Sequence, residues 1–324
     1  MSGEIILVMG PPASGKTTTV EQYTGKGYRR LNRDSFGGSS QKRGNRMHQM
    51  ILELHAHGDR HFVLDNTYRN KVSREEILSL SARLGLPVHA KWLQTTAEQA
   101  QFLAARREVQ KYGHVLTAEE YKQEPFKKDP NCFPPMAQFA YWKAMEPPTV
   151  EEGFASVEKV PFVMDLGPGY AWGAIIFDYD GTLRETTTGD FYPKKPDEVR
   201  LLPGRREKLF DLVRRGNLIL GASNQSGIAR DPGHAHYVSD ENARASFERT
   251  NQLLGVDIDY AYAPERAGVP RTFKRKPQPG MGVEFIEKYR LDPARVLMVG
   301  DMKSDKTFAE RCGFNFAWAK DYFV

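Results

Sequence analysis

The sequence predicts an α/β protein made of two domains, each built around a parallel β-sheet. Three observations support this prediction. Short apolar runs typical of buried parallel strands recur along the chain. In the first half these runs alternate with segments compatible with helices, as a parallel sheet with crossover helices requires. The chain has 324 residues, which is long enough for two domains with complete cores.

Proline and glycine mark the passage between the domains. Pro147 and Pro148 are followed by a Gly-Pro-Gly segment at residues 167–169, a composition that interrupts helices and strands. We therefore expect an N-terminal domain of residues 1–168 and a C-terminal domain of residues 169–324.

The composition restricts the class of protein. The formal net charge of +5 permits a polyanionic partner without requiring one. No apolar run approaches the length of a membrane span, and residues 5–9 are too short for the core of a signal peptide. The two cysteines, Cys132 and Cys312, form neither a disulfide framework nor a zinc pattern. We expect a protein of a reducing compartment, cytoplasmic or associated with the nucleoid or nucleus, with no membrane partner.

The first strand is expected at residues 4–9, and it leads directly into a phosphate-binding loop. Residues 10–17 match the pattern G-x-x-x-x-G-K-[ST], and a helix-compatible segment follows. In such a loop the backbone N–H groups surround a phosphate, the lysine neutralises the β- and γ-phosphates, and the hydroxyl holds Mg²⁺. The sequence therefore predicts a site for a nucleoside triphosphate. Its expected residues are Gly10, Ser14, Gly15, Lys16, Thr17 and Thr18.

Two further strands end in carboxylates, at the rim of the sheet where ligands bind. The strand at residues 28–31 is followed by Asp34, which we assign as the general base for an attacking hydroxyl. The alternative for Asp34 is an N-cap of the next helix. Another strand is expected at residues 62–67, and its tip carries Asp65 and Asn66. Asp65 would order a Mg²⁺-bound water or an arginine or, in the alternative, stabilise a turn.

Basic residues occur in two segments of this half. Residues 41–46 are expected to form a solvated loop near Asp34, within reach of an acceptor phosphate. After a strand at residues 88–93, a helix at residues 97–111 carries Arg106 and Arg107. These arginines would supply charge to the transferring phosphoryl group, or would lie on a solvated helix face.

These segments carry a specific resemblance that covers nearly all of residues 4–163. GPPASGKTT, LNRDSFG, VLDNT, TAEQA with RRE, and MEPPTVEEGF with VPF resemble the kinase domain of the polynucleotide 5′-hydroxyl kinase/3′-phosphatase family, whose members heal nucleic-acid ends. The animal-type kinase is the more similar one. The roles that the resemblance implies are ATP and Mg²⁺ binding for Lys16 and Thr17, general base for Asp34, acceptor positioning for Asp65, and lid arginine for Arg107.

The sequence departs from that family just ahead of the lid arginine. The family has Asn-Asn-Arg where residues 103–105 are Leu-Ala-Ala. The lid assignment therefore stays open between Arg107 and Arg106, and we place Arg106 with the nucleotide-binding residues.

The second domain begins with a strand at residues 173–176, which leads into Phe-Asp-Tyr-Asp-Gly-Thr-Leu at residues 177–183. Asp178 and Asp180 are carboxylates one residue apart, an arrangement that is electrostatically costly unless a cation lies between them. The pattern predicts a Mg²⁺ site in which one aspartate attacks phosphorus and the other handles the proton. The alternative is an acidic turn of ordinary loop composition.

Compatible side chains follow in order. A strand at residues 218–222 ends at Ser223, whose hydroxyl and neighbouring N–H groups can hold phosphate oxygens, and Lys276 can balance an anionic intermediate. A strand at residues 296–299 is followed by Asp301 and Asp305, which add carboxylates for Mg²⁺.

The spacing of these motifs leaves little chain for a lid domain. The residues between Asp180 and Ser223, and between Ser223 and Lys276, are mostly accounted for by the core elements themselves. We therefore expect an open site that admits a polymer end, with Asn224 and Arg230 contacting the substrate at its mouth.

This order of motifs resembles the haloacid-dehalogenase phosphatase superfamily over residues 171–324. The resemblance implies a Rossmann-like sheet with Asp178 as the nucleophile that forms an aspartyl-phosphate. It also implies that Asp180 protonates the leaving alcohol, later activates water, and places its carbonyl on Mg²⁺. The remaining implied roles are phosphoryl stabilisation for Ser223 and Lys276, and metal binding for Asp178, Asp301 and Asp305.

Residues 222–230 and 275–281 also resemble the histidinol-phosphate and heptose-bisphosphate phosphatase branch. Members of that branch usually carry a cysteine-rich zinc loop. The corresponding positions here are Ala263, Thr272 and Lys274, so no zinc is expected, and a sugar or histidinol phosphate becomes a weaker candidate substrate.

Together these features predict a P-loop kinase followed by a Rossmann-like haloacid-dehalogenase phosphatase without a large cap. The two activities make sense together if they act on opposite ends of a break. The predicted function is therefore ATP-dependent phosphorylation of 5′-hydroxyl ends and Mg²⁺-dependent removal of 3′-phosphates in DNA or RNA repair. The domain order is that of the bacteriophage enzyme. The sequence makes no prediction of the oligomeric state. The alternatives are a nucleoside or sugar kinase fused to a metabolite phosphatase, and a nucleotide-regulated binding module with a degraded phosphatase.

Overall fold

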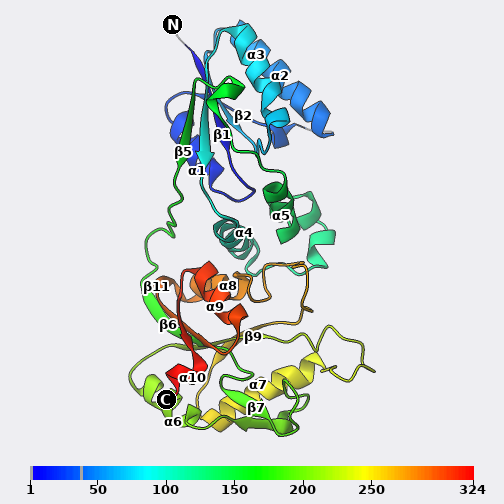
Figure 1. Cartoon of the computed structure of the whole chain (residues 1–324), viewed down its shortest axis with the longest axis vertical. Coiled ribbons are helices and arrows are strands. Elements are labelled where there is room, and N and C mark those ends of the chain that lie inside the picture. The colour runs from blue at the N-terminus through cyan, green and yellow to red at the C-terminus, as the bar shows by residue number, and fades with distance from the viewer. Residues whose placement is uncertain (1–2, 37–38) are drawn as a thin grey trace. The chain divides into compact units, whose positions relative to one another are not determined.

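The computed structural model describes residues 3–36 and 39–324 and divides into two compact units (Figure 1). The N-terminal unit comprises Met1–Ala104 and Glu124–Asp165, and the C-terminal unit comprises Ala105–Gln123 and Leu166–Val324. The division falls within helix α4 (Ala97–Tyr112), whose second half packs with the C-terminal unit.

The N-terminal unit contains a five-stranded parallel sheet with the strand order β2-β3-β1-β4-β5. The strands expected at residues 4–9 and 88–93 are present with those bounds. The strand expected at residues 28–31 is shifted by one residue, and the one expected at residues 62–67 starts at His61 and ends at Asp65. The fifth strand, β5, was not expected. The bounds are β1 Glu4–Met9, β2 Arg29–Asn32, β3 His61–Asp65, β4 Val88–Leu93 and β5 Ser156–Val160.

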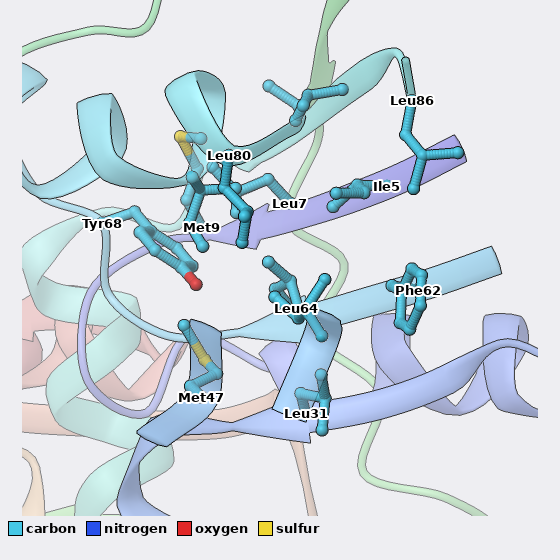
Figure 2. Packing of buried hydrophobic residues seen from close by; sticks show 14 of the residues in the cluster. Ile5, Leu7, Met9, Leu31, Met47, Phe62, Leu64, Tyr68, Leu80 and Leu86 are labelled. Carbon is cyan, nitrogen blue, oxygen red and sulfur yellow. The ribbon is translucent and has the colours of Figure 1, made fainter. Parts of the chain in front are cut away.

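Helices cover both faces of this sheet. Alternate residues of β1 point to opposite sides, so Leu7 belongs to one hydrophobic cluster and Val8 to another. The larger cluster joins the sheet to α2 and α3 and is drawn in Figure 2, whereas Val20 of α1 packs on the opposite face. The helices are α1 Lys16–Thr24, α2 Ser40–Ala56, α3 Lys71–Leu84 and α5 Pro135–Lys143, with short 3₁₀ turns at Arg33–Ser35, Phe126–Lys128 and Val150–Glu152. A further 3₁₀ turn, Glu120–Lys122, belongs to the C-terminal unit.

One local prediction is wrong in this unit. Residues 41–46 do not form a loop but lie in the first turns of α2. The side chain of Ser39 caps this helix by accepting a hydrogen bond from the backbone N–H of Lys42. The cap starts the helix early enough to present its basic residues at the side of Asp34.

The C-terminal unit contains a second five-stranded parallel sheet, with the order β10-β9-β6-β11-β12, and a small antiparallel pair, β7 and β8. The strands are β6 Trp172–Phe177, β7 Arg184–Thr186, β8 Val199–Leu201, β9 Ile219–Asn224, β10 Asp259–Ala263, β11 Leu291–Gly300 and β12 Asn315–Trp318. The helices are α6 Arg205–Arg214, α7 Asp240–Leu254, α8 Gly280–Tyr289, α9 Lys303–Cys312 and α10 Ala319–Tyr322. A 3₁₀ turn lies at Pro196–Glu198.

The core of this unit fixes the ends of the central strands. Phe177 at the end of β6 and the adjoining Tyr179 pack against Phe247 of α7 and Leu209 of α6. Gly221 of β9 allows this packing, because a Cβ there would lie 2.4 Å from the ring of Tyr179. The carboxyl ends of β6, β9 and β11, which are neighbours in the sheet, therefore lie side by side.

The expected architecture of two parallel α/β sheets without a large cap is confirmed for the part of the chain that the structure describes. Between β6 and α8 the chain forms only core elements, the small β7–β8 pair and loops. None of the helices in the described ranges is long and apolar enough to cross a membrane.

Candidate active sites

The phosphate-binding loop connects β1 to α1 and has the backbone of an anion-binding turn. Ala13 and Gly15 both have positive φ, of 61° and 86°, and the loop turns directly into the N-terminus of α1. Gly10 is confined, because a Cβ there would lie 2.6 Å from the Ser14 hydroxyl. The Lys16 ammonium donates to the carbonyls of Gly10 at 3.1 Å and Pro11 at 2.7 Å, so its charge lies over the loop.

The hydroxyls of this loop fit a nucleotide phosphate. Ser14 is buried, and its hydroxyl has no hydrogen-bond partner among the residues that the structure describes. Thr17 and Thr18 are exposed in the first turn of α1. A buried hydroxyl, a lysine and the backbone N–H groups at a helix start are the groups that bind a triphosphate and its Mg²⁺.

Asp34 lies in the 3₁₀ turn after β2, where its backbone N–H donates to the Asn32 side chain at 2.7 Å. Its carboxylate is half-exposed and forms an ion pair of 2.8 Å with Arg43 of α2. This pair has no direct signal in the sequence, because the register of α2 decides which basic residue of the segment points to Asp34.

Asp65 is buried at the end of β3. The Arg30 guanidinium donates to its carboxylate at 2.6 Å, and the Asn32 amide approaches at 3.4 Å. Asn32 and Asp65 are paired in register across β2 and β3, which brings the two predicted strand ends together. Asp65 therefore lies beside the turn that carries Asp34.

The two candidate lid arginines belong to the second half of α4, which packs within the C-terminal unit. Arg106 forms an ion pair of 2.6 Å with Glu287 of α8 and lies over the ring of Tyr170 at 5.3 Å. Burial alone lowers the pKa of Arg106, but Glu287 and Tyr170 outweigh it and the net shift is upward. Arg106 is thus engaged by partners of the C-terminal unit, and the lid role implied for Arg107 stays a prediction.

The second candidate site is a buried cluster of charge at the ends of β6, β9 and β11. Lys276 is buried, and its ammonium contacts Asp178 Oδ1 and Asp305 Oδ1, each at 2.7 Å. It also donates to the carbonyl of Ala222 at 2.7 Å. The predicted nucleophile, lysine and metal carboxylate therefore come together in space, although 127 positions separate the first from the last (305 − 178).

Burial governs the protonation of this cluster. It raises the pKa of Asp178; the Lys276 ammonium opposes the shift and the Asp305 carboxylate adds to it. Burial lowers the pKa of Lys276, but the two carboxylates reverse the shift, so the lysine stays charged. The two buried carboxylates, Asp178 and Asp305, therefore require the positive charge of the Lys276 ammonium beside them.

Asp178, Asp301 and Asp305 can hold a divalent cation, because one oxygen from each lies within 4.8 Å of the others. The backbone is closely fitted around them. A Cβ on Gly181, whose φ is +81°, would lie 2.4 Å from Asp301 Oδ2, and one on Gly300 would lie 2.5 Å from the Asp305 carboxylate. An all-oxygen set of this kind suits Mg²⁺.

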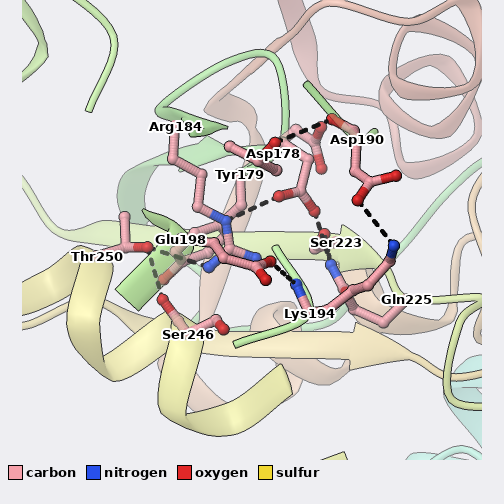
Figure 3. Close-up of polar contacts among 12 residues, drawn as sticks. Asp178, Tyr179, Arg184, Asp190, Lys194, Glu198, Ser223, Gln225, Ser246 and Thr250 are labelled. Atoms are coloured by element: carbon pink, nitrogen blue, oxygen red, sulfur yellow. Dashed lines mark hydrogen bonds and ion pairs between the residues drawn. The ribbon is translucent and has the colours of Figure 1, made fainter. Parts of the chain in front are cut away.

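The carboxylate of Asp180 is outside this group and has different partners. Figure 3 labels two of them, Arg184 and Gln225. Arg184 donates to Asp180 Oδ1 at 2.8 Å, and Gln225 donates to Asp180 Oδ2 at 2.7 Å. The Gln225 amide also donates to the Ser223 hydroxyl at 3.0 Å, so it contacts both the serine predicted to bind phosphate and the acid–base candidate. Neither Arg184 nor Gln225 was among the predicted site residues.

The two predicted substrate contacts differ in their surroundings. Asn224 exchanges hydrogen bonds with the main chain of Lys276: it accepts from the N–H at 2.9 Å and donates to the carbonyl at 3.0 Å. This arrangement favours a role in positioning Lys276. Arg230 lies in the loop after β9, where its guanidinium contacts the His234 ring at 2.8 Å.

The positions at which related phosphatases carry zinc ligands make hydrogen bonds here. The Thr272 hydroxyl donates to Glu265, and Lys274 forms an ion pair of 3.2 Å with Glu284. Ala263 ends β10 and is buried. The loop is therefore held by polar side chains of its own.

Comparison with known proteins characterises both halves. Residues 5–124 match the family model described as an AAA domain, and residues 174–323 match the model described as polynucleotide kinase 3 phosphatase. The heptose-1,7-bisphosphate 7-phosphatase of Mesorhizobium japonicum is 33% identical over 153 residues, which are 46% of this chain and 69% of that protein. The bifunctional polynucleotide phosphatase/kinase of Schizosaccharomyces pombe is 30% identical over 160 residues, which are 49% of this chain and 34% of that protein.

Among solved structures, the heptose-1,7-bisphosphate phosphatase of B. bronchiseptica, crystallised with magnesium and phosphate, is 28% identical, with a TM-score of 0.39. The match covers 45% of this chain and 79% of that one. The expected pairing of a P-loop kinase domain with a haloacid-dehalogenase-type phosphatase domain is confirmed by the two family models. The chain joins an N-terminal domain that matches the AAA model to a C-terminal domain that matches the polynucleotide kinase 3 phosphatase model, and it belongs to one family with the heptose-bisphosphate 7-phosphatases.

Proposed function

We propose that this protein heals nucleic-acid ends, adding a phosphate to 5′-hydroxyl ends and removing phosphate from 3′ ends. The observation that supports the proposal is the presence in one chain of two candidate sites for phosphoryl transfer: the loop around Lys16 and the buried cluster around Asp178. A kinase and a phosphatase that act on the same hydroxyl would cancel each other. On opposite ends of a break, they prepare both ends for sealing.

The kinase reaction is assigned to the N-terminal domain. Lys16 and Thr17 bind ATP and its Mg²⁺, which neutralises charge on the phosphates. Asp34 accepts the proton of the 5′-hydroxyl as the hydroxyl oxygen attacks the γ-phosphorus. Arg43 holds the Asp34 carboxylate through the 2.8 Å ion pair, while Asp65 positions the acceptor. Arg107 supplies charge from the lid.

The phosphatase reaction is assigned to the C-terminal domain, residues 169–324. An oxygen of Asp178 forms a bond to phosphorus while the bond to the 3′-oxygen breaks, and Asp180 gives its proton to that oxygen. Asp180 then takes a proton from the water that cleaves the aspartyl-phosphate, which releases inorganic phosphate. Lys276 and Ser223 stabilise the phosphoryl group throughout.

Mg²⁺ would be held in this domain by the side chains of Asp178, Asp301 and Asp305, together with the carbonyl of Asp180. When bound, it supplies positive charge to the phosphoryl oxygens. The proximity of the three carboxylates supports this assignment.

A metabolite phosphatase fused to a small-molecule kinase is the second candidate. The similarity to heptose-bisphosphate 7-phosphatases favours it, since that similarity extends over 69% of the M. japonicum protein. The similarity to the S. pombe phosphatase/kinase and the attached kinase domain favour the polynucleotide.

One oligonucleotide with a 5′-hydroxyl and a 3′-phosphate tests the proposal. It is incubated with Mg²⁺ and ATP, and both ends are followed by mass spectrometry for the wild type, Lys16→Ala and Asp178→Asn. We expect the wild type to change both ends, Lys16→Ala to lose only 5′-phosphorylation, and Asp178→Asn to lose only 3′-dephosphorylation. Each variant is thus the control for the other.

The opposite result would contradict the proposal. If both ends stay unchanged while a heptose bisphosphate or another small phosphoester is hydrolysed, the polynucleotide assignment fails and the metabolite candidate takes its place. An excess of unlabelled oligonucleotide that leaves this hydrolysis uninhibited would support the same conclusion.

A further inference from the structure

Arg184 is a fully buried cation in the phosphatase domain, and the reaction described above does not use it. Its side chain is 1% exposed, at the start of β7. The turn from Asp180 to Arg184 is closed by a hydrogen bond of 2.9 Å from the N–H of Gly181 to the carbonyl of Arg184. This turn brings the guanidinium back onto the carboxylate of Asp180.

The guanidinium is held on several sides. Its Nε donates to Asp180 Oδ1 at 2.8 Å, and its Nη1 donates to the Thr250 hydroxyl of α7 at 3.0 Å. The rings of Phe247 and Tyr179 lie 4.7 Å and 5.2 Å from its central carbon. A buried arginine with these contacts has a single orientation available, unlike an arginine in a surface ion pair.

The other oxygen of Asp180 is held from the opposite direction. Gln225, which is buried, donates to Asp180 Oδ2 at 2.7 Å and to the Ser223 hydroxyl at 3.0 Å. Each oxygen of the carboxylate therefore has one fixed donor, so rotation of the carboxylate about its last bond breaks at least one short hydrogen bond.

We propose that Arg184 is a positioning residue for acid–base catalysis in the phosphatase, and that together with Gln225 it fixes the orientation of the Asp180 carboxylate. This inference rests on the acid–base role given to Asp180 under the proposed function. Arg184 itself touches neither the phosphoryl group nor the leaving group. It acts by holding Asp180 where a proton can pass to the leaving oxygen.

The dependence of the rate on the leaving group tests this role. Phenyl phosphate and 4-nitrophenyl phosphate have nearly the same shape, but phenolate is much the poorer leaving group and depends more on protonation as the bond breaks. A general acid contributes about 10²- to 10⁴-fold to such a step. A misplaced Asp180 therefore slows phenyl phosphate hydrolysis selectively.

The variants are Arg184→Met, which removes the donors and the charge, and Arg184→Lys, which keeps the charge. We expect Arg184→Met to lose about 10- to 100-fold more kcat/KM on phenyl phosphate than on 4-nitrophenyl phosphate, and Arg184→Lys to restore part of the difference. Arg244→Met, at an exposed ion pair with Asp240 on α7, is the matched control and should leave both rates unchanged.

Equal losses on the two substrates would overturn the positioning role and leave Arg184 as a structural residue. If Arg184→Met does not fold, Thr250→Val decides the question, because it removes the Nη1 contact of Arg184 without touching Asp180. A selective loss on phenyl phosphate supports the role, and equal or absent losses refute it. The polynucleotide assignment fails separately, if the wild type hydrolyses both aryl phosphates but leaves 3′-phosphorylated oligonucleotides intact.

Discussion

Replacement of Lys276 by methionine tests the electrostatics of the phosphatase cluster. Lys276 is the cation that lies 2.7 Å from both Asp178 and Asp305, and all three side chains are nearly inaccessible to water. Methionine keeps the length and removes the charge. The variant therefore leaves two buried carboxylates that repel each other and have lost their common partner.

The magnitude follows from two limits. Breaking a buried ion pair by removing one partner costs about 3–5 kcal/mol. The cost also has an upper limit, because one of the two carboxylates can take up a proton instead of staying charged. Raising the pKa of a carboxyl group from about 4 to the working pH of about 7.5 costs about 5 kcal/mol, at about 1.4 kcal/mol per pKa unit. We expect the C-terminal unit of Lys276→Met to lose about 3–5 kcal/mol of unfolding free energy.

A double-mutant cycle with Asp305→Asn tests whether the effect of this substitution on stability changes sign when Lys276 is replaced. In the wild type, Asp305→Asn removes an attraction to Lys276 and should destabilise. In Lys276→Met, the same change removes a repulsion of Asp178 and should stabilise. The asparagine oxygen can still accept the bond that the Met302 N–H makes at 2.9 Å, so the helix start is conserved in both backgrounds.

Hydrogen exchange in increasing urea measures this cycle in the full-length chain. Peptides that cover β6 report the stability of the C-terminal unit, and peptides that cover β1 report that of the N-terminal unit as an internal control. The reasoning is refuted if Lys276→Met lies within about 1 kcal/mol of the wild type, or if Asp305→Asn has the same effect in both backgrounds.

Three further predictions concern other sites. Gly181→Ala places a Cβ 2.4 Å from Asp301 at a φ of +81°, so phosphatase kcat should fall at least about tenfold with about 1–2 kcal/mol of lost stability, while 5′-phosphorylation stays unchanged. Arg43→Ala removes the half-exposed ion pair with Asp34, so calorimetry should find less than about 1 kcal/mol of lost stability alongside a clear fall in kinase kcat/KM; equal kinase activity would show that Asp34 needs no partner. Burial raises the pKa of Glu108 to about 7 from 4.5, so the folded chain binds this proton more tightly than the unfolded chain. The wild type should therefore lose about 3 kcal/mol between pH 4 and pH 8 that Glu108→Gln does not lose, and parallel melting curves for the two proteins over that range would contradict the assignment.

The location of both candidate sites in the fold was predictable where their residues are local in sequence. The phosphate-binding loop and the Asp178–Asp180 pair each occupy one strand end, and the rule that ligands bind at the carboxyl ends of parallel strands places them correctly. Lys276 and Asp305 could be added because their order along the chain matches a known pattern. The structure brings both onto Asp178.

Partners that depend on side-chain direction were not predictable in the same way. Residues 41–46 were expected to be a loop because they are polar and contain glycine, and their helix is started by the cap at Ser39. Only the register of that helix selects Arg43 as the residue that meets Asp34. A polar segment without hydrophobic periodicity gives no such register from sequence alone.

Asn224 and Gln225 illustrate the same limit within one strand end. Both follow Ser223, and position at the rim suggests contact with substrate for either of them. Successive side chains of a strand point in opposite directions, so Asn224 reaches the main chain of Lys276 whereas Gln225 reaches Asp180 and Ser223. The short Ser-Asn-Gln segment thereby fixes the lysine, the phosphate-binding hydroxyl and the acid–base carboxylate at once. A one-residue slip of β9 would exchange these partners and disconnect all three, which is why we place the precision of this site in the register of β9 against β6.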